Sequence, residues 1–302
     1  MKIKLLALAA LLGFGVPFAA LADGTTVSLD YGGAKRTYIL HVPPNVEPGK
    51  RYPLIIALHG MNGTAEGFEG MTGFDTAADQ YGFFVAYPDS DGPKWDLRGR
   101  DGDIGFAEKL LADVVQNNPV DAARIYVAGH SQGAGLAQAL ACFDTDKVAG
   151  VAVVSENMHP HFEQLCRPSR PIPVLLFHGT ADPISPYNGG ANGVSGTDTL
   201  SSEATAQFWA QADGCSGNSV TTSFPDKISD GTTTTSNLQT WGRCRNGATV
   251  AFYTIAGGGH TWPGAAVKRD RFGGSSTTVH ASAIILHVFS ETLAAENSST
   301  QK

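Results

Sequence analysis

Hydrophobic residues are grouped along the chain in short runs that alternate with segments of helical periodicity. Three β-rich runs come first, at 26–29, 38–42 and 54–58, and the third, Leu-Ile-Ile-Ala-Leu, is continuously apolar. A run without polar positions is typical of a strand that is covered on both faces. Further strands are expected at 83–87, 124–128, 148–154, 174–177 and 250–255, and helices at 103–115, 132–141, 202–212 and 279–294.

This order of elements predicts the fold class. A hairpin followed by repeated strand and helix units is typical of an α/β protein, in which a mostly parallel central sheet has helices on both faces. Reactive groups in such a fold gather at the carboxyl ends of the strands. Segments 188–199 and 229–236 are rich in Gly, Thr and Ser, and we expect them to be surface loops.

The N-terminal segment, 1–22, has the pattern of a signal peptide. Lys2 and Lys4 precede a long apolar run, and Ala-Leu-Ala at 20–22 matches the small-x-small sequence that signal peptidases cleave. A membrane anchor or a buried first helix is the alternative. We expect export, to the periplasm or the medium, because Gly13, Gly15 and Pro17 interrupt the apolar run and polar chain follows at 23–24. No later segment has the roughly 18 apolar residues of a membrane span.

Composition supports a globular protein and argues against several classes. Of the 302 residues, 42% are hydrophobic and 16% are charged, which is too apolar and too weakly charged for a disordered chain. The residues after the leader, 23–302, fit one large α/β domain. The net charge is −7 and the basic run at 268–271 is short, which argues against nucleic acid as a partner.

The four cysteines are even in number, and in an exported protein they suggest two disulfides. The sequence alone allows three pairings. We favour Cys142 with Cys166 and Cys215 with Cys244, because each pair brackets a single stretch of chain. Free structural thiols are the alternative, and the spacing matches no zinc site.

A candidate nucleophile follows the predicted strand at 124–128. Residues 129–133 read Gly-His-Ser-Gln-Gly and lead into a predicted helix. A G-x-S-x-G sequence between a strand and a helix is the pattern of a nucleophile elbow, a sharp turn that exposes the serine hydroxyl. The motif alone is a weak signal, and its place after a buried strand gives it weight. We therefore predict that Ser131 is a nucleophile.

A serine hydroxyl needs a base to remove its proton and an acid to orient that base. Along the chain of this fold the acid and then the histidine follow the serine, each after a later strand. Asp182 comes after the strand at 174–177, and His260 comes after the strand at 250–255, behind three glycines. Each could simply be a loop residue. The order and the strand-end positions together predict a triad of Ser131, Asp182 and His260.

The charge that develops on the substrate oxygen needs hydrogen-bond donors. One expected donor is the backbone N–H of Gln132, the residue after the nucleophile. The second should come from the loop after the strand at 54–58, which reads His-Gly-Met-Asn-Gly. We predict that it is the N–H of Met61. The alternative is that this loop only turns the chain.

Two tryptophans on predicted loops, Trp95 and Trp262, can reach the same edge, and we predict that they help to bind a flat or apolar acyl group. Structural packing is the alternative, and Trp209, which lies in a helical pattern, is expected in the core. His159 and His161 could form part of a metal site, but no set of carboxylates or thiols in the sequence supplies the remaining ligands. We therefore expect a surface loop there. No metal and no cofactor are expected, since the sequence has no glycine-rich phosphate loop.

Together these motifs resemble those of secreted esterases of the polyhydroxybutyrate depolymerase and feruloyl esterase group. The resemblance implies an α/β-hydrolase fold, ester hydrolysis without a cofactor, and catalytic positions for Ser131, Asp182 and His260. The most specific segment is His-Thr-Trp-Pro-Gly at 260–264. The matching segments are 58–60, 129–133, 178–182, 209–215 and 258–264, within a similarity that extends over 36–263.

The first hypothesis is therefore a secreted serine esterase that forms an acyl-enzyme on feruloyl or related esters of plant polysaccharide. Polyesters or oligomers of the poly(3-hydroxybutyrate) type are the alternative substrates. The chain ends about 40 residues after Trp262, which disfavours a separate polymer-binding domain and action on crystalline polymer. A serine peptidase and a non-catalytic binding protein of the same fold are further hypotheses.

Overall fold

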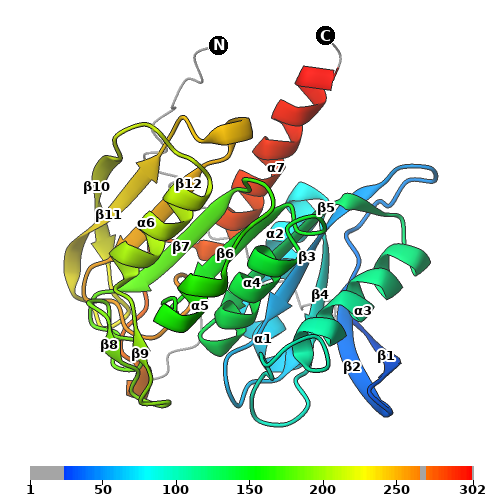
Figure 1. Cartoon of the computed structure of the whole chain (residues 1–302), viewed down its shortest axis with the longest axis horizontal. Coiled ribbons are helices and arrows are strands. Elements are labelled where there is room, and N and C mark those ends of the chain that lie inside the picture. The colour runs from blue at the N-terminus through cyan, green and yellow to red at the C-terminus, as the bar shows by residue number, and fades with distance from the viewer. Residues whose placement is uncertain (1–23, 266–269, 301–302) are drawn as a thin grey trace.

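A ten-stranded sheet forms the centre of the molecule in this computed structural model, which describes residues 24–265 and 270–300 (Figure 1). The predicted signal peptide, 1–22, lies outside the described residues. In order across the sheet, the strands are β1 (Thr25–Tyr31), β2 (Ala34–His41), β4 (Phe84–Pro88), β3 (Tyr52–Leu58), β5 (Val120–His130), β6 (Gly150–Val154), β7 (Val174–Gly179), β12 (Val250–Ile255), β11 (Thr233–Trp241) and β10 (Val220–Lys227).

The six middle strands, from β4 to β12, run parallel to one another. Antiparallel pairs complete both edges, β2 with β1 on one side and β11 with β10 on the other. Because the parallel strands all end at one edge, the loops that follow β3, β5, β6, β7 and β12 meet there. The predicted mostly parallel sheet is confirmed.

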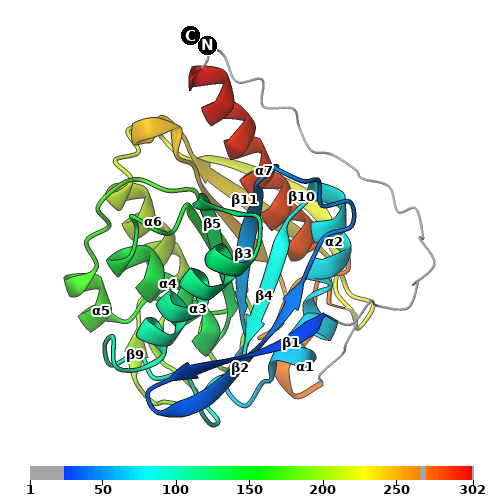
Figure 2. The same cartoon turned by 90° about the vertical axis from the view of Figure 1, so that its right-hand side faces the viewer.

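Helices cover both faces of the sheet (Figure 2). One face carries α3, α4, α5 and α6, and the other carries α1, α2 and α7. Within the described residues, no helix is long and apolar enough to cross a membrane. The helices are α1 (Ala65–Thr72), α2 (Phe74–Tyr81), α3 (Asp103–Asn117), α4 (Gln132–Phe143), α5 (Pro160–Leu165), α6 (Ser202–Ala212) and α7 (Ala281–Thr300), with short 3₁₀ turns at Arg245–Gly247 and Asp270–Phe272.

The sheet separates two hydrophobic cores, and β3 contributes to both. Leu54, Ile56 and Leu58 pack into the core under α3, α4 and α6. Ile55 and Ala57 pack into the core under α1, α2 and α7. Since successive side chains of a strand point to opposite faces, a strand covered on both sides must be apolar at every position. Coverage on both faces therefore explains why the run at 54–58 is continuously apolar.

The sheet edge that β10 and β11 form differs in part from the sequence prediction, which was wrong for segment 229–236. The sequence analysis placed a surface loop there, whereas β11 begins at Thr233 and pairs with β10 in a hairpin. The hydroxyl of Ser236 is buried and donates a hydrogen bond of 2.6 Å to Asp226. A Thr- and Ser-rich strand at a sheet edge has a mostly polar, partly exposed surface, so its composition resembles that of a loop.

The segments after β6 and β7 contain regular structure where the sequence predicted loops. The sequence predicted a loop at 159–161, whereas Pro160 is the first residue of α5, a position that suits proline because its missing N–H is not needed there. The predicted loop at 188–199 contains a small two-stranded ladder of β8 (Gly190–Ala191) and β9 (Asp198–Thr199).

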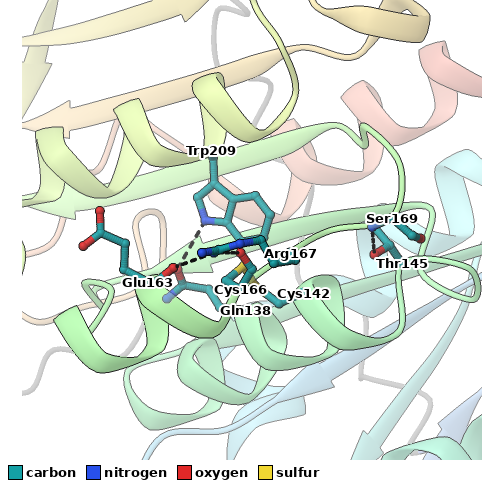
Figure 3. Close-up of a disulfide and its surroundings, with 8 residues drawn as sticks. All are labelled: Gln138, Cys142, Thr145, Glu163, Cys166, Arg167, Ser169 and Trp209. Atoms are coloured by element: carbon teal, nitrogen blue, oxygen red, sulfur yellow. Dashed lines mark hydrogen bonds between the residues drawn. A yellow bond between two sulfur atoms is a disulfide. The ribbon is translucent and has the colours of Figure 1, made fainter.

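Two disulfides are present, and both have the pairing that the sequence analysis favoured. Cys142 at the end of α4 is bonded to Cys166 directly after α5 (Figure 3). Cys215 after α6 is bonded to Cys244. Trp209, predicted in the core, is buried above the first bond and donates a hydrogen bond from Nε1 to Gln138 at 3.3 Å. The first bond therefore ties α5 to the core on the α4 face.

We expect the double substitution Cys142→Ala/Cys166→Ala to lower the free energy of unfolding by about 3 kcal/mol, since the bond closes a loop with a sequence separation of 24. Urea unfolding of both proteins measures the difference. The second bond has a separation of 29, so the matched variant Cys215→Ala/Cys244→Ala should lose a similar amount. An unchanged unfolding midpoint in both variants would contradict the prediction.

Candidate active site

Ser131 lies at the sharp turn between β5 and α4. Its backbone has a φ of 54°, in the left-handed region that non-glycine residues seldom adopt. The turn is held by the Ser131 N–H, which donates to Val154 O at 2.9 Å. Side chains at the two flanking glycines would clash, Gly129 with the backbone of Gly133, and Gly133 with the carbonyl of Leu58. Both glycines therefore permit the tight turn.

His260, in the loop after β12, contacts both other members of the predicted triad. Its Nε2 lies 2.8 Å from Ser131 Oγ, and its Nδ1 lies 2.8 Å from Asp182 Oδ2. A carboxylate only accepts, so Nδ1 carries the hydrogen and Nε2 is free to accept from the serine hydroxyl. The His260 N–H donates to Phe272 O at 2.6 Å, which fixes the loop. The three residues thus form one hydrogen-bonded chain.

Asp182, in the loop after β7, is buried and fully hydrogen-bonded. Its Oδ1 accepts from the backbone N–H groups of Ile184 at 2.8 Å and Ser185 at 2.9 Å. Burial alone would raise the pKa of Asp182, but hydrogen bonds from His178 and His260 outweigh it and hold the pKa well below its usual value. The hydrogen bonds therefore favour the carboxylate form of Asp182.

His178 is a residue of this site that the sequence analysis missed. Its Nε2 lies 2.8 Å from Ser185 O and 3.4 Å from Asp182 Oδ2. His178 therefore holds the loop at 182–185 in place through contacts with Asp182 and Ser185. The signal was present in the sequence, because His178 is the last polar residue of an apolar strand and stands four positions before Asp182.

The loop after β3 approaches the nucleophile closely. A side chain added at Gly60 would lie 3.2 Å from Ser131 Cβ. Within the described residues, no acceptor is found for the backbone N–H of Met61, the next residue, nor for that of Gln132 at the start of α4. N–H groups in the first turn of a helix have no partner inside it. Two free donors thus lie on either side of the Ser131 turn.

Trp95 does not occupy the predicted binding position. Its side chain is 2% exposed, and its Nε1–H donates to His59 O at 2.7 Å. Its backbone N–H donates to Gln132 Oε1 at 3.0 Å. Trp95 thus links the loop after β3 to the start of α4, the two segments with the free donors. A ring enclosed in this way cannot stack on a ligand, so the sequence interpretation of Trp95 was wrong.

Trp262 is likewise a packing residue, although it borders the cleft described below. Its ring is 1% exposed and meets Phe68 and Phe74 edge-on, each with 5.4 Å between ring centroids. Its Nε1–H donates to Ser282 Oγ at 3.0 Å, which anchors the His260 loop against α7. Trp262 packs against α1 and α2 and also borders the cleft, so its role in substrate binding stays a prediction.

A cleft of about 640 Å³ opens over Ser131 and His260. Met61, Leu97 and Val194 are exposed apolar side chains on its walls. Its polar lining includes His159, placed before α5, and Glu156, which follows β6. Among the residues that the structure describes, no group of three or more His, Cys, Asp or Glu side chains could hold a metal ion.

Comparisons with known proteins match this description. The family model described as "Esterase PHB depolymerase" matches residues 36–207. A putative esterase, NocK, from Nocardia uniformis subsp. tsuyamanensis is 33% identical over 265 residues, which cover 81% of this chain and 76% of that protein. Feruloyl esterase B from Piromyces equi is 30% identical over 237 residues, 74% of this chain but only 42% of the relative's length.

Among solved structures, an acetyl xylan esterase from Aspergillus awamori superimposes with a TM-score of 0.59 and 19% identity, covering 79% of this chain and 94% of that one. At this level of identity the likeness concerns the fold. The sheet order, the helices on both faces and this neighbour agree on the α/β-hydrolase fold.

Proposed function

Because the chain belongs to the esterase PHB depolymerase family and is thus a carboxylic ester hydrolase, we propose that it works as a serine esterase through Ser131, His260 and Asp182. The observation that carries the proposal is the continuous hydrogen-bonded chain from Ser131 Oγ through His260 to Asp182 Oδ2, with 2.8 Å at each step. This is the geometry in which a histidine acts as general base.

In the proposed reaction, Ser131 Oγ attacks the ester carbonyl while His260 Nε2 takes the hydroxyl proton. The imidazolium that forms is stabilised by the Asp182 carboxylate. His260 then gives the proton to the departing alkoxide, and the alcohol leaves behind an acyl group on Ser131. A water molecule repeats the sequence, releases the acid and restores the serine hydroxyl.

The oxyanion of each tetrahedral intermediate is proposed to bind to the backbone N–H groups of Met61 and Gln132. Free donors on both sides of the Ser131 turn support this role, as does the position of Gln132 at the N-terminus of α4, where the helix dipole favours negative charge. Trp95 supports it indirectly, because it holds both segments together.

For the substrate we propose feruloyl or related esters of plant polysaccharide, with 3-hydroxybutyrate polyesters or oligomers as the second candidate. The apolar cleft walls suit a flat acyl group, and a feruloyl esterase is among the relatives. We expect kcat/KM for methyl ferulate to exceed that for a 3-hydroxybutyrate dimer by about tenfold or more. The same measurement on the amide of ferulic acid tests the peptidase alternative, and a preference for the oligomer or the amide would contradict the proposal.

We also propose that the protein is secreted. The two disulfides support an oxidising compartment, and the N-terminal pattern supports cleavage after Ala22. The mature N-terminus, sequenced from protein expressed in a bacterial host, should begin at Asp23-Gly24. An intact N-terminus in a membrane fraction would indicate an anchor instead.

A further inference from the structure

Glu156 occupies a central place in the cleft that the proposed reaction does not use. It follows β6, two residues after Val154. Since β6 lies between β5 and β7 in the sheet, Glu156 lies between the Ser131 turn and the Asp182 loop. Its side chain lines the same cleft as Ser131 and His260, yet the residue is only 8% exposed. Glu156 therefore lines the space above the proposed nucleophile.

The two carboxyl oxygens of Glu156 have different surroundings. Oε1 accepts a hydrogen bond from the Asn157 N–H at 3.0 Å and a longer one from the Ser185 hydroxyl at 3.5 Å. No donor to Oε2 is found within the described residues, and Oε2 is not among the buried atoms that lack a partner. Oε2 is therefore the oxygen that is open to the cleft.

Burial favours the neutral, protonated form of Glu156. Burial raises its pKa, hydrogen bonds from Asn157 and Ser185 lower it in part, and the Asp182 carboxylate raises it again, to about 8. Because Oε1 already accepts two hydrogen bonds, the proton resides on Oε2. The side chain thus presents an O–H donor to the cleft, close to the reacting serine.

We propose that Glu156 is a substrate-binding residue whose Oε2–H donates a hydrogen bond to an oxygen atom near the scissile ester. Among esters that are otherwise alike, the enzyme then prefers those that carry a hydroxyl or ether oxygen on a neighbouring carbon. This inference rests on the proposed serine esterase function. The chemistry has two sources, the sugar on the alcohol side of a polysaccharide ester and the oxygenated chain on the acyl side of a 3-hydroxyalkanoate.

Selectivity follows from the cost of an unpaired polar group. When a substrate without this oxygen fills the cleft, it removes water from Oε2–H without replacing the hydrogen bond. A site built to hydrogen-bond a substrate oxygen discriminates strongly against the analogue that lacks it. Burial of Glu156 makes the effect larger than it would be at an exposed side chain.

Two substitutions at Glu156 separate the donor from the shape of the side chain. In Glu156→Gln the amide oxygen can take the place of Oε1, and the N–H₂ group then replaces the Oε2–H donor. In Glu156→Leu the donor is lost. Glu163→Gln and Glu163→Leu on α5 are the matched controls, because within the described residues no hydrogen bond or ion pair of the Glu163 carboxyl is found and it does not line the cleft.

Each protein is assayed on two pairs of esters. The acyl pair is methyl 3-hydroxybutyrate and methyl butyrate, and the alcohol pair is methyl 5-O-acetyl-arabinofuranoside and ethyl acetate. The measured quantity is the ratio of kcat/KM for the oxygen-bearing ester to that for the plain one. Glu156→Leu should lower this ratio about tenfold or more in one pair, whereas Glu156→Gln and the Glu163 variants should stay within about twofold of wild type. The pair that responds identifies the source of the oxygen.

The pH dependence of the ratio gives a readout that a purely structural role would not change. The selectivity of wild-type protein should change as the pH rises through about 8, because Oε2 loses its proton and can then only accept a hydrogen bond, whereas the selectivity of Glu156→Gln should stay constant. The other titratable groups in contact with this region are Asp182 and His178 from β7 and its loop, His260 from the β12 loop, and His159. All of them remain in Glu156→Gln, so the difference between the two profiles isolates Glu156.

Unchanged ratios in Glu156→Leu, or an equal loss in Glu156→Gln, would overturn the role of Glu156 while leaving the esterase function intact. If wild-type protein hydrolyses neither these four esters nor methyl ferulate, the proposed function fails, and the role of Glu156 fails with it.

Discussion

Substitution of Ser131 by alanine is expected to lower kcat for p-nitrophenyl acetate by a factor of about 10⁵ or more. Without Oγ there is no atom on which the acyl-enzyme can form, and His260 has no hydroxyl to deprotonate. The free donors of Met61 and Gln132 remain, so a small residual rate above that of water should persist. Stopped-flow or long-time assays of the purified variant measure the loss, and activity at the wild-type rate would refute the assignment of Ser131.

Ser155 provides a matched control for this substitution. It follows β6 with a φ of 54°, equal to that of Ser131, but its hydroxyl donates to Thr261 O at 3.2 Å. Ser155→Ala removes one such hydrogen bond, which corresponds to about 1 kcal/mol, so the rate should change by less than about tenfold. A comparable loss in both variants would mean that the turn geometry, and not the Ser131 nucleophile, limits activity.

Substitution of Asp182 by asparagine should lower kcat by a factor of about 10⁴ without unfolding the protein. The backbone N–H groups of Ile184 and Ser185 donate to Oδ1, so the amide oxygen must take that place. The N–H₂ group then faces His260 Nδ1 and moves the ring hydrogen to Nε2. A histidine in this tautomer cannot accept the proton of Ser131.

Asp146 is an exposed aspartate after α4 and serves as the control. Asp146→Asn should leave kcat within about twofold of wild type. Far-ultraviolet circular dichroism of both variants checks that they are folded. A loss of less than about tenfold in Asp182→Asn would show that Asp182 does not set the tautomer of His260.

The central strands and the members of the hydrogen-bonded chain could be predicted because each has a local cause. A strand covered on both faces is apolar at every position, as β3 is, and its end is therefore visible in the sequence. Parallel strands bring their ends to one edge, so Ser131, Asp182 and His260 could be placed together. Ser131 precedes His260 by 129 residues and Asp182 precedes it by 78.

Other features depend on contacts that leave no local signature. The hairpin of β10 and β11 lies at a sheet edge and has Thr, Ser and Asn on a partly exposed surface, so it reads as a loop. The sequence places Trp95 and Trp262 near the correct edge but does not indicate which way a ring points. Both rings turn inward, because each satisfies its N–H with a buried acceptor.

Glu156 is a different kind of omission. It follows an apolar strand, as Asp182 does, and the same reasoning could have selected it. A single glutamate after a strand has no motif around it, and its raised pKa depends on burial and on the charge of Asp182, neither of which the sequence reveals.

Labelling with a fluorophosphonate probe, followed by mass spectrometry of the digested protein, is the most direct test that Ser131 is the activated nucleophile. The reagent forms a stable adduct only with a serine that a neighbouring base activates. We expect one adduct, on Ser131, that is absent from Ser131→Ala and forms much more slowly in Asp182→Asn. An unlabelled Ser131 in protein that still hydrolyses esters, or an adduct on another serine, would contradict this expectation.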